Sequence, residues 1–128
     1  MSDNGHKVAV VQAKDTQFVG GGLRPYLEYR DLGVNTATGG QYHAHVIRAA
    51  APCPDGGTGK HFHDLDFQMN YVLKGWVKMW IEGAGEVRID AGGCWLQPPS
   101  IPHSLVDYSE DAEWVEVTAP AAFDTKEL

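Results

Sequence analysis

The chain has 128 residues, which is the size of one domain, and we expect a single domain over residues 1–128. Its hydrophobic content of 43% is typical of a globular protein, and no stretch approaches the roughly 18 consecutive apolar residues of a membrane span. The formal net charge of -7 argues against nucleic acid or an anionic membrane surface as a partner.

The chain begins with a polar segment, Met1 to Lys7, that lacks the apolar core of a signal peptide. Secretion is therefore not expected, and the expected location is the cytoplasm. Cys53 and Cys94 lie far apart in the sequence. One disulfide could join them, but in a reducing compartment we expect two free thiols.

Short runs rich in valine, isoleucine, tyrosine and tryptophan follow one another along the chain, separated by glycine and proline. No segment shows a 3.6-residue apolar period over ten or more residues. In chain order we expect strands over residues 8–12, 26–31, 42–48, 60–63, 68–73, 77–82, 86–90, 94–97, 103–107 and 113–117. Many short strands with turn signals between them predict an all-β fold, either a sandwich or a barrel.

Two loops stand out by their composition. Residues 51–59 are rich in glycine and proline and lead directly into the strand predicted over 60–63, so we expect a mobile rim there. Residues 98–102 contain three prolines, which fix φ and donate no backbone hydrogen bond. This second loop is therefore stiff, and it sets the direction in which His103 enters the next strand.

His61 and His63 are separated by one residue on a predicted strand. Residues i and i+2 of a strand point to the same face and are about 7 Å apart, so both imidazoles can lean onto one metal ion. His103, arriving from another strand, would complete a pocket that stays open on one side, as catalytic metals require. The sequence therefore predicts a metal site inside a β structure.

The spacing of these histidines resembles the two signature motifs of the cupin superfamily. The first motif reads His-x-His, four residues, Glu or Gln, six residues and Gly. It is matched here by His61, His63, Gln68 and Gly75. The second motif contains Gly, Pro and His at fixed distances, and it is matched by Gly92, Pro98 and His103. The two motifs occur in order and in register over a little more than a third of the chain.

The resemblance implies a cupin-type double-stranded β-helix, which is a jelly-roll barrel. It also implies one divalent metal ion per chain, either Zn, Ni, Mn or Fe, and a small-molecule substrate or ligand. The implied metal ligands are His61, His63, Gln68 and His103. A homodimer is expected from the habit of the family and from open sheet edges.

Two residues of the second motif depart from the usual pattern. Ser100 stands where the family usually has glycine, which matters if the corner requires a positive φ. Asp107 stands where the family usually has asparagine, four residues after His103. On a regular strand both side chains share one face, so Asp107 is either a hydrogen-bond acceptor near the site or an exposed carboxylate.

The departure with chemical consequences is Gln68, because the family commonly has glutamate there. An amide oxygen is a neutral donor, so it can coordinate a metal, although more weakly than a carboxylate. Three imidazoles and one amide leave a divalent ion its full charge, which strengthens its Lewis acidity and favours an anionic or enolate-like ligand. The pattern favours non-redox chemistry, such as isomerisation or lyase action, on a small carbonyl or carboxylate substrate.

Three alternatives remain open. The same ligand set could serve a mononuclear iron dioxygenase, which metal identity and oxygen uptake would reveal. The domain could instead be a non-catalytic module that binds or senses a small ligand. It could also use its metal only to stabilise the barrel, in which case chelation would lower thermal stability without any ligand-induced change.

Other residues receive less specific predictions. His43 and His45 repeat the His-x-His spacing without a following Glu or Gln, so we expect a polar sheet face or a subunit contact and no second metal. Asn70 and Val72 share a strand face with Gln68 and are candidates for the pocket wall. Core or interface positions are expected for Trp76, Trp80, Trp95 and Trp114.

Overall fold

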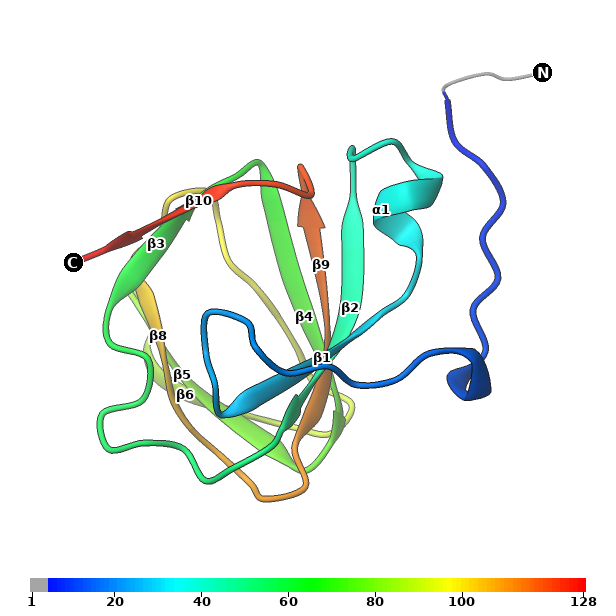
Figure 1. Cartoon of the computed structure of the whole chain (residues 1–128). Coiled ribbons are helices and arrows are strands. Elements are labelled where there is room, and N and C mark those ends of the chain that lie inside the picture. Colours follow the sequence, from blue (N-terminus) through cyan, green and yellow to red (C-terminus); the bar gives the residue numbers. More distant parts are fainter. Residues whose placement is uncertain (1–4) are drawn as a thin grey trace.

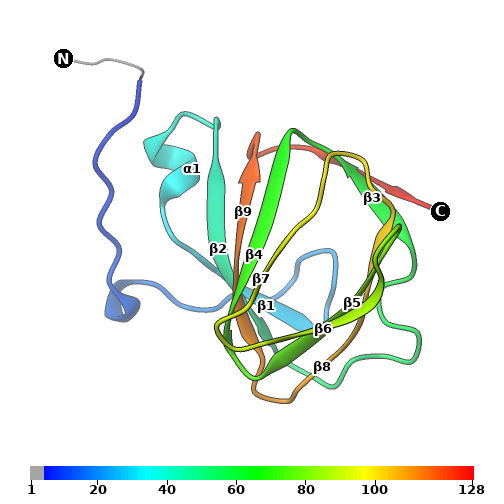
Figure 2. The same cartoon turned by 180° about the vertical axis from the view of Figure 1, so that it is seen from behind.

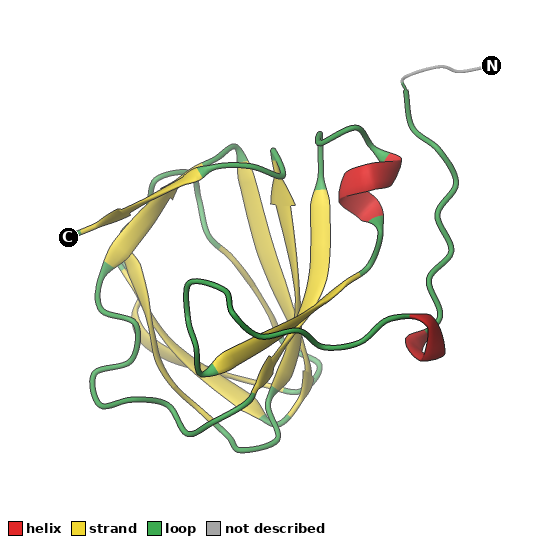
Figure 3. Cartoon of the chain, viewed as in Figure 1, coloured by secondary structure: helices red, strands yellow, loops and turns green. Residues whose placement is uncertain are grey.

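The computed structural model describes residues 5–128, and its regular structure consists of ten β-strands and two short helical segments (Figures 1 and 3). The elements are η1 (Ala13–Asp15), β1 (Leu27–Asp31), α1 (Val34–Ala37), β2 (His43–Ala49), β3 (His61–Asp64), β4 (Phe67–Lys74), β5 (Trp76–Ile81), β6 (Gly85–Asp90), β7 (Cys94–Leu96), β8 (His103–Tyr108), β9 (Glu113–Ala119) and β10 (Asp124–Glu127).

The strands form two five-stranded antiparallel sheets. The first has the order β1-β2-β9-β4-β7 and the second has the order β10-β3-β8-β5-β6. Figures 1 and 2 show β4 and β9 of the first sheet facing β3, β8 and β5 of the second. The all-β prediction is confirmed.

The space between the sheets is apolar at one end and polar at the other. On β5, Val77 and Met79 alternate with less buried neighbours, as expected of a strand with one face in the core. On β4, the inward positions change character along the strand, from Gln68 through Asn70 to Val72. The strand therefore contributes apolar surface to the core at one end and polar groups to a cavity at the other.

The strand predicted over residues 8–12 is wrong. This segment runs outside the barrel in extended form (Figure 2), and Val8 and Val10 are 93% and 76% exposed. Its apolar alternation fits a strand, but no strand of the described chain pairs with it, and a strand needs a partner for its backbone groups. The sequence analysis also missed β10, whose four residues Asp-Thr-Lys-Glu carry no apolar pattern and which forms by pairing with β3.

The loops before β3 and before β8 each contain a position with a tightly constrained backbone near the cavity. The corner before β8 places Ser100 at a φ of 60°, so serine occupies the left-handed conformation that suits glycine better. Gly57 lies so close to β8 that a Cβ there would overlap the carbonyl oxygen of Leu105. Its neighbour Thr58 exchanges two hydrogen bonds with Leu105, of 2.9 and 3.0 Å. These bonds anchor residues 57–58 of the predicted rim to the second sheet.

The described chain contains no helix that is long and apolar enough to cross a membrane. Both Cys53 and Cys94 are free, as expected from the sequence. The cytoplasmic location and the extent of the domain over residues 1–128 stay predictions, and residues 1–4 lie outside the described part of the chain.

Candidate metal centre and pocket

Three histidines from two neighbouring strands come together at the polar end of the cavity. His61 and His63 project from β3, and His103 at the start of β8 lies directly opposite His61 in the register. Their potential ligand atoms all lie within 4.8 Å of one another, and the ring centroids are 4.3 to 4.9 Å apart. The predicted convergence of the two motifs is therefore observed, and the cluster has the composition of a metal site that is open on one side.

The hydrogen bonds of the cluster fit a metal ion. Nδ1 of His61 lies 2.9 Å from the carbonyl oxygen of Gly59, and Nδ1 of His103 lies 2.9 Å from that of Ile101. A carbonyl only accepts, so both rings carry their proton on Nδ1 and keep the Nε2 lone pair free. Nδ1 of His63 is 2.8 Å from the hydroxyl of Thr125, which can accept in the same way. Such bonds hold metal-ligating imidazoles in one tautomer and orientation.

Burial keeps these imidazoles neutral. Burial, together with the smaller effect of the neighbouring imidazoles, lowers the pKa of His63 and of His103 to about 4. Burial also lowers the pKa of His61. A protonated imidazole cannot bind a metal, so three histidines that resist protonation are prepared for ligation at neutral pH.

Gln68 lines the same pocket and is held at both ends of its amide. Its Oε1 accepts a hydrogen bond of 3.1 Å from Nε2 of Gln97, and its Nε2 donates one of 2.7 Å to Oε2 of Glu116. A carbonyl oxygen has two lone pairs, so Oε1 retains one for a further partner. The role of Gln68 as a metal ligand stays a prediction.

Glu116 on β9 is a pocket residue that the sequence analysis missed. Its Oε1 lies 2.8 Å from Nε2 of His45, and Nδ1 of His45 lies 3.0 Å from Nε2 of His43. Burial alone would raise the pKa of Glu116, but the hydrogen bonds from His45 and Gln68 outweigh it, so the pKa is lowered and the carboxylate is ionised. The one sequence feature that could have indicated it is strand alternation, which places residues 114, 116 and 118 on the same face of the predicted strand.

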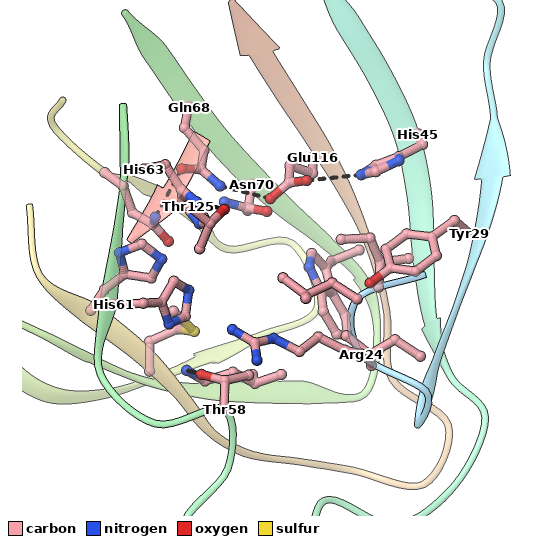
Figure 4. A pocket seen from close by; sticks show the side chains of 18 of the residues that line it. Arg24, Tyr29, His45, Thr58, His61, His63, Gln68, Asn70, Glu116 and Thr125 are labelled. Carbon is pink, nitrogen blue, oxygen red and sulfur yellow. Dashed lines mark hydrogen bonds and ion pairs between the residues drawn. The ribbon is translucent and has the colours of Figure 1, made fainter. Parts of the chain in front are cut away.

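The pocket joins both sheets and the segment before β1 (Figure 4). The cavity has a volume of about 240 Å³, which is at the small end for small-ligand sites and suits a compact molecule. The predicted wall residue Asn70 lines it, whereas Val72 lies in the core. The other polar lining residues are Arg24, Tyr29, Thr58 and Thr125. Burial, together with the charge of Glu116, raises the pKa of Tyr29 to about 12, so its phenol is protonated.

The remaining predicted residues divide between the interior and the surface. Trp95 and Trp114 line the pocket, whereas Trp76 and Trp80 are half-buried on the outside, each under a basic side chain. Asp107 is exposed, because the pairing of β8 with β5 shifts register between Lys78 and Met79. Beyond this irregularity Asp107 no longer shares the face of His103, so it is the exposed carboxylate of the two alternatives.

Comparison with solved structures finds the same architecture in several enzymes. The polyketide cyclase RemF from Streptomyces resistomycificus has a TM-score of 0.73 at 19% identity, over 95% of this chain and 86% of that one. KdgF from Halomonas sp. has a TM-score of 0.65 at 18% identity, over 85% and 92%. A sugar phosphate isomerase of the cupin superfamily from Silicibacter pomeroyi has a TM-score of 0.62 at 17% identity, over 85% and 74%. At these identities the likeness shows the fold.

No curated protein matches the sequence. The family described as "Cupin domain" matches residues 53–118, which is more than half of the chain and includes all three histidines of the cluster. The sequence motifs, the two facing sheets and the similar structures agree with this match, and the predicted jelly-roll architecture is confirmed. The protein belongs to the cupin family.

Proposed function

We propose that this cupin is a metal-dependent enzyme that acts on a small carbonyl or carboxylate compound by non-redox chemistry, such as isomerisation or lyase action. The observation that supports the proposal best is the cluster of His61, His63 and His103, whose Nε2 atoms are left free by the bonds at Nδ1. A divalent Zn, Ni, Mn or Fe ion held by these residues and Gln68 would supply Lewis acidity toward an oxygen of the substrate.

The donor set favours non-redox chemistry because all four donors are neutral. The three imidazoles have lowered pKa values and Gln68 is an amide, so they offset none of the charge of a divalent ion. A glutamate in place of Gln68 would cancel one unit and stabilise a higher oxidation state better. Among the similar structures, a polyketide cyclase and a sugar phosphate isomerase are consistent with this class of chemistry.

The residues around the cluster supply what such chemistry needs besides a metal. Glu116 is an ionised carboxylate on the pocket wall, bonded through Oε1 to His45, and its negative charge can hold a substrate hydroxyl by a hydrogen bond. Apolar side chains such as Trp95 and Trp114 surround the polar groups and displace water from them. The pocket thus offers a fixed negative charge and a largely apolar wall beside the histidine cluster.

A homodimer is part of the proposal. The outer face of the first sheet carries three neighbouring side chains, Phe67, Tyr71 and Leu96, that are 39 to 57% exposed. A second copy could cover this apolar face. Sedimentation of the wild type and of Tyr71→Glu would test it, and a monomer at all concentrations would contradict it.

The experiment that tests the proposed function is elemental analysis of protein purified without a histidine tag. We expect about one zinc, nickel or manganese per chain in the wild type and none in His61→Ala/His63→Ala. The matched control is His43→Ala/His45→Ala, which removes two histidines of the same spacing and should keep its metal. Iron together with oxygen uptake would instead support the dioxygenase, and a metal-free wild type would leave a binding module.

A further inference from the structure

Arg24 is a partly buried cation that lines the pocket, and the structure gives it no close partner among the described residues. It lies in the irregular segment before β1, and its side chain is only 18% exposed. Its Nη2 is buried and has no hydrogen-bond partner among the described residues. The nearest carboxylate oxygen, Oε2 of Glu127, is 3.6 Å away on a side chain that is 58% exposed. That distance is too long for a hydrogen bond, and exposed pairs of this kind contribute little.

The guanidinium points into the cavity, toward the side that holds His61 (Figure 4). Arg24 and the three clustered histidines line this same pocket. A guanidinium has five N–H donors in a planar fork that matches a carboxylate in shape and charge. A buried N–H donor such as Nη2 is costly to leave without an acceptor, unless a ligand supplies one.

A second polar group on the pocket wall lacks a partner as well. Asn70 is 1% exposed, and neither atom of its side-chain amide has a hydrogen-bond partner among the described residues. Between the polar groups the wall is apolar, with Leu27, Ile47 and Leu105 among the lining residues. Such a cavity suits a short carbon skeleton that carries several oxygens.

We propose that Arg24 is the anion anchor of this pocket: its guanidinium binds the carboxylate of a small organic acid, while another oxygen of the same molecule faces the histidine cluster. The proposal rests on the proposed function, because it names the substrate class of the same site. It adds that the substrate carries a carboxylate that binds Arg24 and takes no part in the reaction. It assigns substrate orientation to a residue outside both cupin motifs.

The test is calorimetric titration with succinate and with its neutral diamide, succinamide, as the matched ligand. Each is titrated into the protein as purified and into EDTA-treated protein, so that binding to a metal and binding to Arg24 are separated. We expect succinate to bind and succinamide to bind much more weakly. Arg24→Gln should weaken succinate binding about tenfold or more in both preparations, since hydrogen bonds to a charged group are lost.

Two control variants separate recognition from structure. Arg88→Gln removes an exposed arginine that pairs with Asp90 far from the pocket, so it changes the net charge equally and should leave succinate binding unchanged. Glu127→Gln removes the distant carboxylate partner and should leave binding unchanged or tighten it. If Arg24 served only to hold β10, Glu127→Gln and Arg24→Gln would instead lower the melting temperature alike and affect succinate equally.

The outcomes distinguish this proposal from the proposed function. Equal succinate affinity of the wild type and Arg24→Gln, equal affinity for succinamide, or no succinate binding to the wild type would each overturn the anchor and leave the metal site untouched. Conversely, an Arg24-dependent affinity in a protein that never contains metal would support the anchor while the proposed function failed.

Discussion

Two histidine pairs with the same spacing lie on two strands of this barrel, and only one pair belongs to a three-imidazole cluster. His61 and His63 on β3 meet His103, which lies opposite His61 on β8. His43 and His45 on β2 meet Glu116, which lies opposite His45 on β9. The comparison teaches that the residue across the strand pair, which is distant in sequence, determines what a local His-x-His pattern does.

The two pairs also differ in how they use their ring nitrogens. In the first pair each Nδ1 is bonded to a backbone carbonyl or a hydroxyl, and each Nε2 is left for a further partner. In the second pair the rings bond to each other at 3.0 Å, and the outer nitrogen of His45 is taken by Glu116. Both nitrogens of His45 are therefore occupied within the protein, and only Nδ1 of His43 is left without a partner among the described residues, whereas both rings of the first pair keep Nε2 for a ligand.

The largest effect is expected from removing His103, the member of the first cluster that lies on the neighbouring strand β8. His103→Ala should abolish stoichiometric metal binding while the protein stays folded, because the remaining histidines cannot form a three-imidazole site. The corresponding change opposite the second pair, Glu116→Ala, should keep a bound metal. Metal titration followed by elemental analysis measures both, and an unchanged metal content in His103→Ala would contradict the assignment.

The second prediction exchanges the amide of Gln68 and the carboxylate of Glu116, whose hydrogen bond connects the surroundings of the two histidine pairs. Gln68→Glu places a second carboxylate beside Glu116, at a position where Gln68 now donates a 2.7 Å hydrogen bond. Two carboxylates that close cannot both ionise, and we expect a loss of roughly 1–3 kcal/mol in the free energy of unfolding. Gln68→Glu/Glu116→Gln should recover most of this loss in urea unfolding. Equal stability of Gln68→Glu and the double variant would show that repulsion between the two carboxylates is not the cause of the loss.

A smaller effect concerns the orientation of the first pair. Thr125→Val removes the hydroxyl that lies 2.8 Å from Nδ1 of His63 and keeps nearly the same volume. Loss of such a partner lowers metal affinity by about 10–100-fold in comparable sites. Thr125→Ser keeps a hydroxyl and is the matched control. Competition with a chromogenic chelator gives the affinities, and equal values for the valine and serine variants would rule out this role.

The smallest effect is expected at the outer member of the second pair. His43→Ala removes the hydrogen bond to His45 but leaves His45 bonded to Glu116. We expect a change of about 0.5–1.5 kcal/mol in unfolding free energy, which is the usual net value of one hydrogen bond, and no change in metal affinity. A large fall in metal affinity would mean that the two pairs are coupled through Glu116 and Gln68.

The features predicted correctly from sequence depend on local patterns and on motif spacing. Runs of β-forming residues between glycines and prolines located nine of the ten strands in the described part of the chain, and the two motifs placed His61, His63 and His103 together. What failed depends on partners far along the chain. Residues 8–12 alternate like a strand but have nothing to pair with, and β10 has no alternation but pairs with β3.

The missed pocket residues have the same physical explanation. Glu116 could not be distinguished from a surface glutamate until β9 was placed beside β2 and β4. Arg24 lies in an irregular segment, where no periodicity predicts the direction of a side chain. Ser100, in contrast, was identified from the motif as a position where glycine is usual, and the structure shows the reason, which is a φ of 60°.

The hydrogen bond between His63 and Thr125 spans 62 positions of the sequence. The histidine cluster likewise joins β3 and β8, which are separated in the sequence by the four strands β4 to β7. Contacts between such distant segments require long loops to close, and this closure costs conformational entropy. We therefore expect a metal ion to bind in full only after β3 and β8 have come together. Stoichiometric metal uptake would report that an individual molecule has finished folding, and it offers a measure of conformational quality in any preparation of this protein.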